Sequence, residues 1–112
     1  MSTYTPDRWL IVKISDKEDN SHYRVFASWY GGYLGSDSWK LNSGITSATL
    51  EDGAYHFAGS SGSVYICYPG SYGASGYAHG VLDHLIKESE TVGTTITVLP
   101  EGTDPLKLNY NE

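Results

Sequence analysis

Apolar and polar residues alternate along most of the chain, and this alternation predicts short β-strands. In the segment 9–14, Leu10, Val12 and Ile14 alternate with Trp9, Ile11 and Lys13, and the polar run 16–20 after it predicts a turn. The segment 23–30 is expected to be its hairpin partner, with one face formed by Tyr23, Val25, Ala27 and Trp29. A tight turn at 51–53 divides two of the further strands that we expect at 38–41, 45–50, 55–58, 64–68 and 94–99.

One segment has helical rather than strand periodicity. Its apolar stripe, expected to pack on a sheet, consists of Tyr77, Val81, Leu82, Leu85 and Ile86. Ser75 is expected to cap this helix, and Gly93 lies where a helix commonly ends. The pattern predicts an α+β fold in a single domain (1–112): an antiparallel sheet of about five to seven strands, one C-terminal helix packed on one face, then a final strand.

Charge and composition exclude several classes of protein. With 7 Lys and Arg against 13 Asp and Glu, the formal charge is −6, which disfavours extended nucleic-acid binding. No run approaches the ~20 apolar residues of a membrane span, and the N-terminus lacks a signal-peptide pattern. The single cysteine, Cys67, cannot form an internal disulfide or a zinc site. We therefore expect a cytoplasmic protein without metal, cofactor or membrane contact.

No motif in the chain predicts catalysis. The glycine-rich segments match neither a phosphate loop nor a dinucleotide fingerprint, and 59–63 departs from Gly-x-Ser-x-Gly. Cys67 lies in an apolar strand, which is typical of an unreactive core thiol. No pair at i,i+4 is found among His22, His56, His79 and His84. We expect the protein not to be an enzyme.

The segment 28–45 combines aromatic, glycine and polar residues, and it predicts a binding pocket. Stacking on a ligand ring is expected from Trp29, Tyr33 or Trp39. Directed polar contacts are expected from Asp37, Lys40, Asn42 and Ser43, and phosphate contacts from Arg24 and Lys40. In the alternative interpretation, Asp37 and Asn42 only brace a turn and Trp39 belongs to the core.

The run W-Y-G-G-Y-L-G-S-D-S-W-K-L-N-S-G-I at 29–45, with 62–67 and 72–73 further on, resembles small uncharacterised proteins encoded by tailed bacteriophages. The resemblance covers roughly the middle half of the chain, and it implies a context rather than a chemistry. Small phage proteins often counter host defences, some by sequestering nucleotide immune signals and others by blocking a host protein.

Three functions follow as hypotheses. The first is a non-enzymatic, homo-oligomeric binder of a small nucleotide-like ligand, acting as a sponge for a host immune signal in the infected cell. The second is a protein-binding inhibitor of a host defence factor or a structural phage component, which would use exposed aromatic residues. The third is a phosphodiesterase or other hydrolase using His56 or Asp37. Because an acidic protein attracts anions weakly, the first requires Arg24 and Lys40 to form a locally positive pocket.

Overall fold

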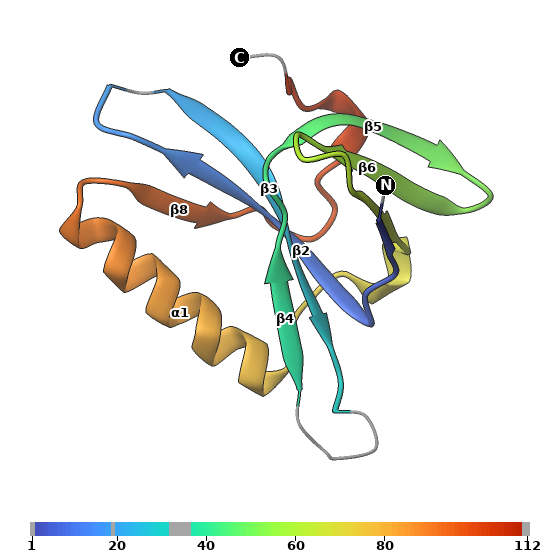
Figure 1. Cartoon of the computed structure of the whole chain (residues 1–112), viewed down its shortest axis with the longest axis horizontal. Coiled ribbons are helices and arrows are strands. Elements are labelled where there is room, and N and C mark those ends of the chain that lie inside the picture. The colour runs from blue at the N-terminus through green and yellow to red at the C-terminus, as the bar shows by residue number, and fades with distance from the viewer. Residues whose placement is uncertain (1, 19, 32–36, 111–112) are drawn as a thin grey trace.

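The computed structural model describes residues 2–18, 20–31 and 37–110. Its strands form two four-stranded sheets (Figure 1). Sheet A has the order β1-β7-β6-β5, from β1 (Thr3–Tyr4), β7 (Val64–Cys67), β6 (Ala54–Gly59) and β5 (Ile45–Glu51). Sheet B has the order β4-β3-β2-β8, from β4 (Ser38–Leu41), β3 (Ser21–Trp29), β2 (Arg8–Ser15) and β8 (Thr95–Val98). The helices are α1 (Gly76–Thr91) and two short 3-10 turns, η1 (Pro69–Ser71) and η2 (Pro105–Lys107).

The predicted α+β class is confirmed, with α1 followed by the late strand β8. The strands are divided between two sheets, whereas the sequence predicted one. The division occurs at Gly44, whose φ of 132° is rarely adopted by residues with a side chain, so the chain can leave sheet B after β4 and enter sheet A at β5. The short strand β1 was not predicted, because two residues carry no alternation; it pairs in parallel with β7.

Local sequence explains both long hairpins. Strands β2 and β3 pair from Arg8 opposite Ser28 to Ser15 opposite Ser21, as the matching alternation predicted. At their turn, the Asp16 carboxylate accepts hydrogen bonds from the backbone N–H groups of Glu18 and Asn20. The β5–β6 turn also forms where expected, with Asp52 and Gly53 in the left-handed region (φ of 52° and 80°).

Helix α1 covers one face of sheet B. As predicted, the Ser75 hydroxyl caps the helix by accepting the Ala78 N–H at 3.2 Å, and Gly93 follows its end with a φ of 79°. The expected apolar stripe is wrong at one position. Tyr77 is 47% exposed, and its neighbour Ala78 is buried instead, because the face that meets the sheet is centred on Ala78 and Leu82.

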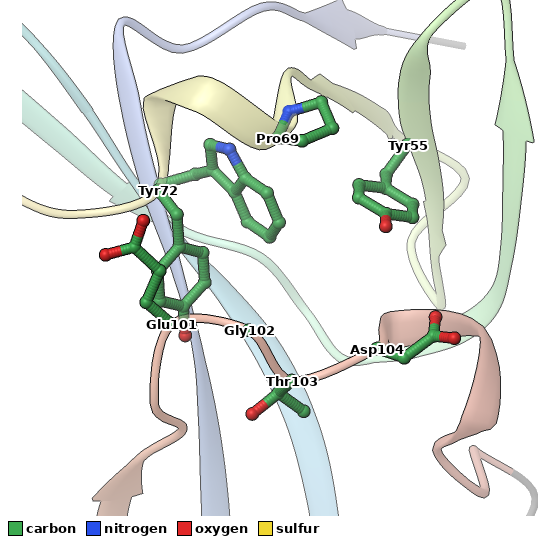
Figure 2. Close-up of a pocket in the computed structure, with 8 residues that line it drawn as sticks. Tyr55, Pro69, Tyr72, Glu101, Gly102, Thr103 and Asp104 are labelled. Carbon is green, nitrogen blue, oxygen red and sulfur yellow. The ribbon is translucent and has the colours of Figure 1, made fainter.

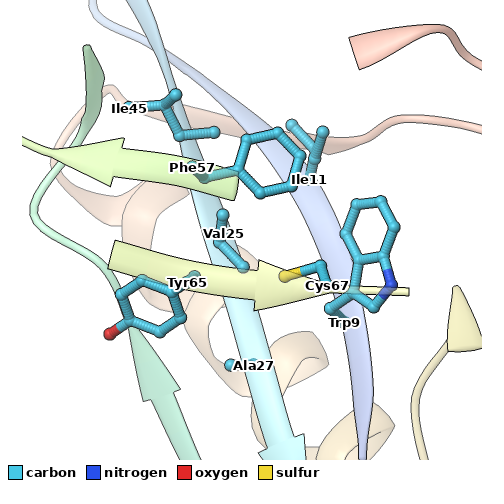
Figure 3. Close-up of a cluster of buried hydrophobic side chains, with 8 residues drawn as sticks. All are labelled: Trp9, Ile11, Val25, Ala27, Ile45, Phe57, Tyr65 and Cys67. Carbon is cyan, nitrogen blue, oxygen red and sulfur yellow. The ribbon is translucent and has the colours of Figure 1, made fainter. Parts of the chain in front are cut away.

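The two sheets pack face to face, so sheet B is the middle of three layers. One core cluster, shown in Figure 3, lies between the sheets and consists of Trp9, Ile11, Val25, Ala27, Ile45, Phe57, Tyr65 and Cys67. A second cluster lies between sheet B and α1 and consists of Leu10, Val12, Phe26, Ala78 and Leu82. Successive residues of a strand in sheet B therefore face different layers. None of the described helices is long and apolar enough to cross a membrane.

Candidate functional site

Strand alternation separates the two tryptophans of the predicted pocket. Trp39 lies opposite Ser28 on the helix side of sheet B, where its ring stacks on Phe26 with centroids 5.8 Å apart. Trp29 belongs to the other face and packs against the core between the two sheets. One ligand ring bound on one face of the sheet cannot contact both tryptophans.

Lys40 lies on the Trp29 side of sheet B. It is opposite Ala27, and its Nζ lies 5.1 Å from the centroid of the Tyr4 ring. The same Tyr4 ring makes an edge contact with Trp29, with centroids 6.3 Å apart. The structure thus brings Trp29 and Lys40 together through Tyr4 from β1, a residue that the sequence did not predict for this role.

The second predicted cation, Arg24, lies on the opposite face of sheet B from Lys40. It is opposite Val12, on the helix side, and its Nε donates a hydrogen bond of 2.9 Å to Nε2 of His22. Lys40 and Arg24 therefore do not converge, and no single phosphate group could contact both side chains.

The remaining predicted site residues make contacts within the protein. The Asp37 carboxylate accepts the Gly31 N–H at 2.6 Å and the Ser75 hydroxyl at 3.3 Å. Asn42 is 3% exposed, and its Oδ1 accepts the Val25 N–H at 2.8 Å. The Ser43 hydroxyl accepts the Ser61 N–H at 2.9 Å. Asp37 and Asn42 thus hold together segments that are distant in sequence, beyond the turn-bracing role of the alternative interpretation. Trp39 is 38% exposed, so it is not the core residue of that interpretation, and Tyr33 lies outside the described residues.

A pocket of about 320 Å³ opens at one end of the interface between the sheets (Figure 2). Sheet B contributes one wall and sheet A another, and the segment around η1 and the loop after β8 complete it. Figure 2 shows Tyr55 reaching in from β6, with Glu101 and Asp104 at the two ends of the loop. The lining residues are Trp9, Tyr55, Pro69, Tyr72, Glu101, Gly102, Thr103 and Asp104.

Three aromatic rings meet at large angles in this pocket. The Trp9 ring meets the Tyr72 ring at 88°, with centroids 4.8 Å apart. It meets the Tyr55 ring at 60°, with centroids 6.0 Å apart. Trp9 is 2% exposed, so it supports the two rings from behind, and the half-buried Tyr55 and Tyr72 provide the accessible aromatic surface.

Hydrogen bonds fix two of these rings in place. Nε1 of Trp9 donates to the Tyr68 carbonyl at 2.7 Å. The Tyr72 hydroxyl donates to the Leu99 carbonyl at 2.5 Å and accepts the Ile11 N–H at 3.3 Å. Burial raises the pKa of this hydroxyl. Tyr72 therefore joins β2 to the segment after β8 and presents a ring of fixed orientation to the pocket.

The open side of the pocket is acidic. Glu101 and Asp104 are both exposed. Oδ1 of Asp104 also accepts a hydrogen bond from the Leu106 N–H of η2. Among the described residues that line the pocket, none is Lys, Arg or His. Arg8 is a nearby cation: its pKa is raised mainly by its hydrogen bond to the Tyr30 hydroxyl, with a smaller electrostatic contribution from Glu101.

The cysteine, histidine and acidic side chains are the candidates for reactive or metal-based chemistry. Burial strongly raises the pKa of the Cys67 thiol, so the nucleophilic thiolate is disfavoured. His56 faces away from the core between the sheets because it alternates with Tyr55 and Phe57, and Nδ1 of His56 lies 3.8 Å from Glu51. Within the described part of the chain, no three His, Cys, Asp or Glu residues are grouped so as to hold a metal ion.

Sequence reasoning missed every residue of this pocket. Trp9, Tyr55 and Tyr72 come from β2, β6 and the segment after η1, and only the packing of the sheets brings them together. The turn chemistry of 100–105 was visible in the sequence, but its proximity to these rings was not. The chain matches no protein-family model, and comparisons with curated proteins and with solved structures likewise find no match.

Proposed function

We propose that this protein is a non-enzymatic small-molecule binding protein whose ligand occupies the pocket between Trp9, Tyr55 and Tyr72. The observation that carries the proposal is a concave space of about 320 Å³ with aromatic walls and a polar open side. Ligand sites are typically concave spaces of roughly 300–1,000 Å³, mostly apolar, with a few polar groups that orient the ligand.

Rigid walls support binding in this pocket. The Trp9 and Tyr72 rings are held by hydrogen bonds to backbone groups, and the Tyr55 ring stacks on Phe57 with centroids 6.0 Å apart. Side chains that are already ordered lose little conformational entropy when a ligand binds, so more of the contact energy contributes to affinity.

The lining favours binding over catalysis. General acid–base catalysis near neutral pH needs a group whose pKa lies close to the working pH. The pKa of the Tyr72 hydroxyl is raised still further from neutrality, and both of its hydrogen bonds are used within the fold. His56 and Asp37, the residues named for a hydrolase, do not line this pocket: His56 lies in β6 of sheet A, and Asp37 lies just before β4 of sheet B.

Sequestration of a nucleotide-derived host signal is a narrower binding function that would use a second surface, outside this pocket. Its support is the group formed by Tyr4, Trp29 and Lys40, which offers aromatic rings and one cation. The separation of Arg24 from Lys40 removes the paired cations expected to hold a phosphate. A nucleotide ligand would therefore depend on Lys40 and on backbone N–H groups.

A ligand screen with matched variants tests the proposal. Thermal shift and native mass spectrometry would be run with a metabolite library on the wild type, Tyr55→Leu and Tyr77→Leu. Tyr77→Leu is the control because it makes the same change at an exposed position outside the pocket. We expect ligands that bind the wild type and Tyr77→Leu but not Tyr55→Leu. Absence of any ligand, or equal binding by all three proteins, would overturn the proposal.

A separate arm of the screen addresses nucleotides. Cyclic nucleotides and cyclic ADP-ribose isomers would be incubated with the wild type and Lys40→Gln, and bound ligand would be released by heat and identified by mass spectrometry. Recovery from the wild type with loss in Lys40→Gln would support the sponge. Failure of this arm alone would reject the nucleotide and leave small-molecule binding in place. Native mass spectrometry also reports the subunit number and so tests the expected homo-oligomer.

Protein binding is a second candidate function, supported by exposed aromatic side chains. Trp39 is 38% exposed, and Tyr30, Tyr68 and Tyr77 are more exposed still. Such residues are enriched in protein interfaces. Binding of one host or virion protein, measured with purified components and lost in a Trp39→Ala/Tyr77→Ala double variant, would support this function. Unchanged affinity in that variant would show that Trp39 and Tyr77 do not contribute to protein binding.

A further inference from the structure

We infer that the ligand of the pocket is a small organic cation with an alkylated ammonium group. The inference rests on the proposed function and specifies the chemistry of its ligand. It depends on two independent features of the same space: aromatic faces in the walls and carboxylates on the open side.

The aromatic walls suit a cation that carries methyl or methylene groups. The face of a Trp or Tyr ring carries negative charge density, which attracts a cation placed within about 6 Å of the ring centroid. Trp9 is only 2% exposed and acts as a buried support that meets Tyr55 at 60° and Tyr72 at 88°. The accessible aromatic surface comes from the two half-buried tyrosines, and an ammonium group in the pocket would contact that surface.

The charges around the pocket also favour a cation. Glu101 and Asp104 lie at the two ends of the loop that borders it (Figure 2), and the whole protein has a formal charge of −6. These carboxylates would attract a cation and repel a phosphate or carboxylate ligand. The described lining residues include no Lys, Arg or His, and Arg8 is a cation outside the lining.

The same features disfavour a metal ion. A bare divalent cation needs several oxygen, nitrogen or sulfur ligands that converge on one point. No such group of three His, Cys, Asp or Glu residues is found in the described ranges 2–18, 20–31 and 37–110. Aromatic faces compensate poorly for the water that a small, strongly hydrated ion would lose, whereas an alkylated ammonium ion is already weakly hydrated.

Substitution of Arg8 should change affinity in opposite directions for a cationic and an anionic ligand, so it provides a decisive test. Arg8 precedes Trp9 in the chain, and its guanidinium lies close to Gly73, the neighbour of Tyr72, so its charge lies near the edge of the pocket. Glu101 also contributes to the raised pKa of Arg8. If the ligand is a cation, Arg8→Gln should strengthen binding, because a repulsive charge is removed and Glu101 is freed. If the ligand is an anion, the same change should weaken binding.

Isothermal titration calorimetry with choline and its neutral isostere, 3,3-dimethylbutan-1-ol, isolates the effect of the charge. These molecules have the same shape, so apolar contact contributes similarly to both. We expect choline to bind the wild type at least about tenfold more tightly. AMP is the anionic probe and should not bind. A trimethyllysine peptide tests whether the cation comes from a protein side chain: tighter binding than choline would support the cation and identify that source.

Charge-neutralising variants locate the effect within the pocket. Glu101→Gln and Asp104→Asn should each weaken choline binding about two- to fivefold, and Arg8→Gln should strengthen it by up to about twofold. Asp104→Asn keeps the oxygen that accepts the Leu106 N–H, so η2 should persist. Glu90→Gln makes the same charge change at an exposed position on α1 and should leave affinity unchanged. Circular dichroism melting of each variant confirms folding.

The outcomes separate this inference from the proposed function. Equal affinity for choline and the neutral alcohol, or weakened binding in Arg8→Gln, would overturn the cation while leaving the pocket as a binding site. If the library screen finds a neutral or anionic ligand that requires Tyr55, the inference is wrong and the proposed function stands. If no compound binding depends on Tyr55, both fail.

Discussion

The two aromatic groups of this protein show how strand geometry controls convergence. Trp29 and Trp39 are close in sequence and lie on the paired strands β3 and β4, but the alternation of side chains places them on opposite faces of sheet B. Trp9, Tyr55 and Tyr72 are far apart in sequence, yet the centroids of the Tyr55 and Tyr72 rings lie 6.0 Å and 4.8 Å from that of Trp9 because the sheets pack together. Nearness along the chain is therefore a weaker guide to a binding site than the face that each residue occupies.

The largest effect is expected when one tryptophan from each group is substituted. Trp9 is 2% exposed and contacts three aromatic rings, so Trp9→Ala should lower the free energy of unfolding by about 3–5 kcal/mol. Trp39 is 38% exposed, and Phe26 is its stacking partner, so Trp39→Ala should cost only about 1–2 kcal/mol. Urea denaturation measures both values. Equal losses would contradict the difference between the groups.

The next largest effect concerns Asn42, which the sequence placed among the ligand-binding residues. Its Oδ1 accepts the Val25 N–H, so Asn42→Ala would leave that N–H unpaired inside the protein and should destabilise the fold by about 1–3 kcal/mol. Affinity for a pocket ligand, measured by calorimetry, should not change. Ser43→Ala, at the exposed neighbouring position, should cost less than about 1 kcal/mol. A loss of affinity in Asn42→Ala with unchanged stability would restore its predicted role.

Local signals explain why most of the fold was predictable. The strands and the helix are bounded by turn and cap residues whose effects act within a few positions, such as Asp52 and Gly53 between β5 and β6, and Ser75 before α1. The division into two sheets was not predicted, because it depends on the direction the chain takes at Gly44. One unused signal was present: the unbroken apolar run 9–12 is typical of a strand covered on both faces.

The candidate site was less predictable because it depends on tertiary packing. The sequence pointed to the tyrosines and tryptophans of 28–45, but no sequence spacing relates Trp9 to Tyr55 or Tyr72. Glu101 and Asp104 lie in a loop whose turn chemistry was visible, whereas its position beside those rings follows from backbone contacts such as the Leu99 N–H donating to the Ile11 carbonyl. Pairing partners between distant segments cannot be read from a local pattern.

A smaller effect is expected from removal of the Tyr72 hydroxyl, which fixes one of the three aromatic rings that line the pocket. Tyr72→Phe removes the hydrogen bonds to Leu99 and Ile11 and should destabilise the protein by about 1–1.5 kcal/mol. The ring should also become less constrained, so that affinity for the pocket ligand decreases. Tyr77→Phe is the matched control on the exposed face of α1, where stability should be unchanged within about 0.5 kcal/mol. Equal stability of the two variants would show that the hydroxyl does not anchor the ring.

The smallest expected effect is a dependence of stability on pH at His22, on the strand that carries Arg24. The pKa of His22 is lowered, first by partial desolvation of the ring and then by the charge of Arg24. Because the folded state binds this proton less readily than the unfolded state, the contribution of His22 is fully present above the unfolded pKa of about 6.5 and is lost as the pH falls through that value toward the lowered folded pKa. Protonation would also remove the Nε2 lone pair that accepts from Arg24.

Urea denaturation of the wild type, His22→Gln and Arg24→Gln at about pH 7.5 and about pH 5.5 measures this contribution. The wild type should lose more stability between the two pH values than His22→Gln, because glutamine cannot titrate. Arg24→Gln should lie between them, since the larger cause of the lowered pKa, desolvation of the ring, persists without the arginine. If all three proteins lost the same stability, His22 would not contribute. If Arg24→Gln also weakened anion binding on the helix side of sheet B, Arg24 would regain its predicted ligand-binding role. The separation of Arg24 from Lys40 argues against that role.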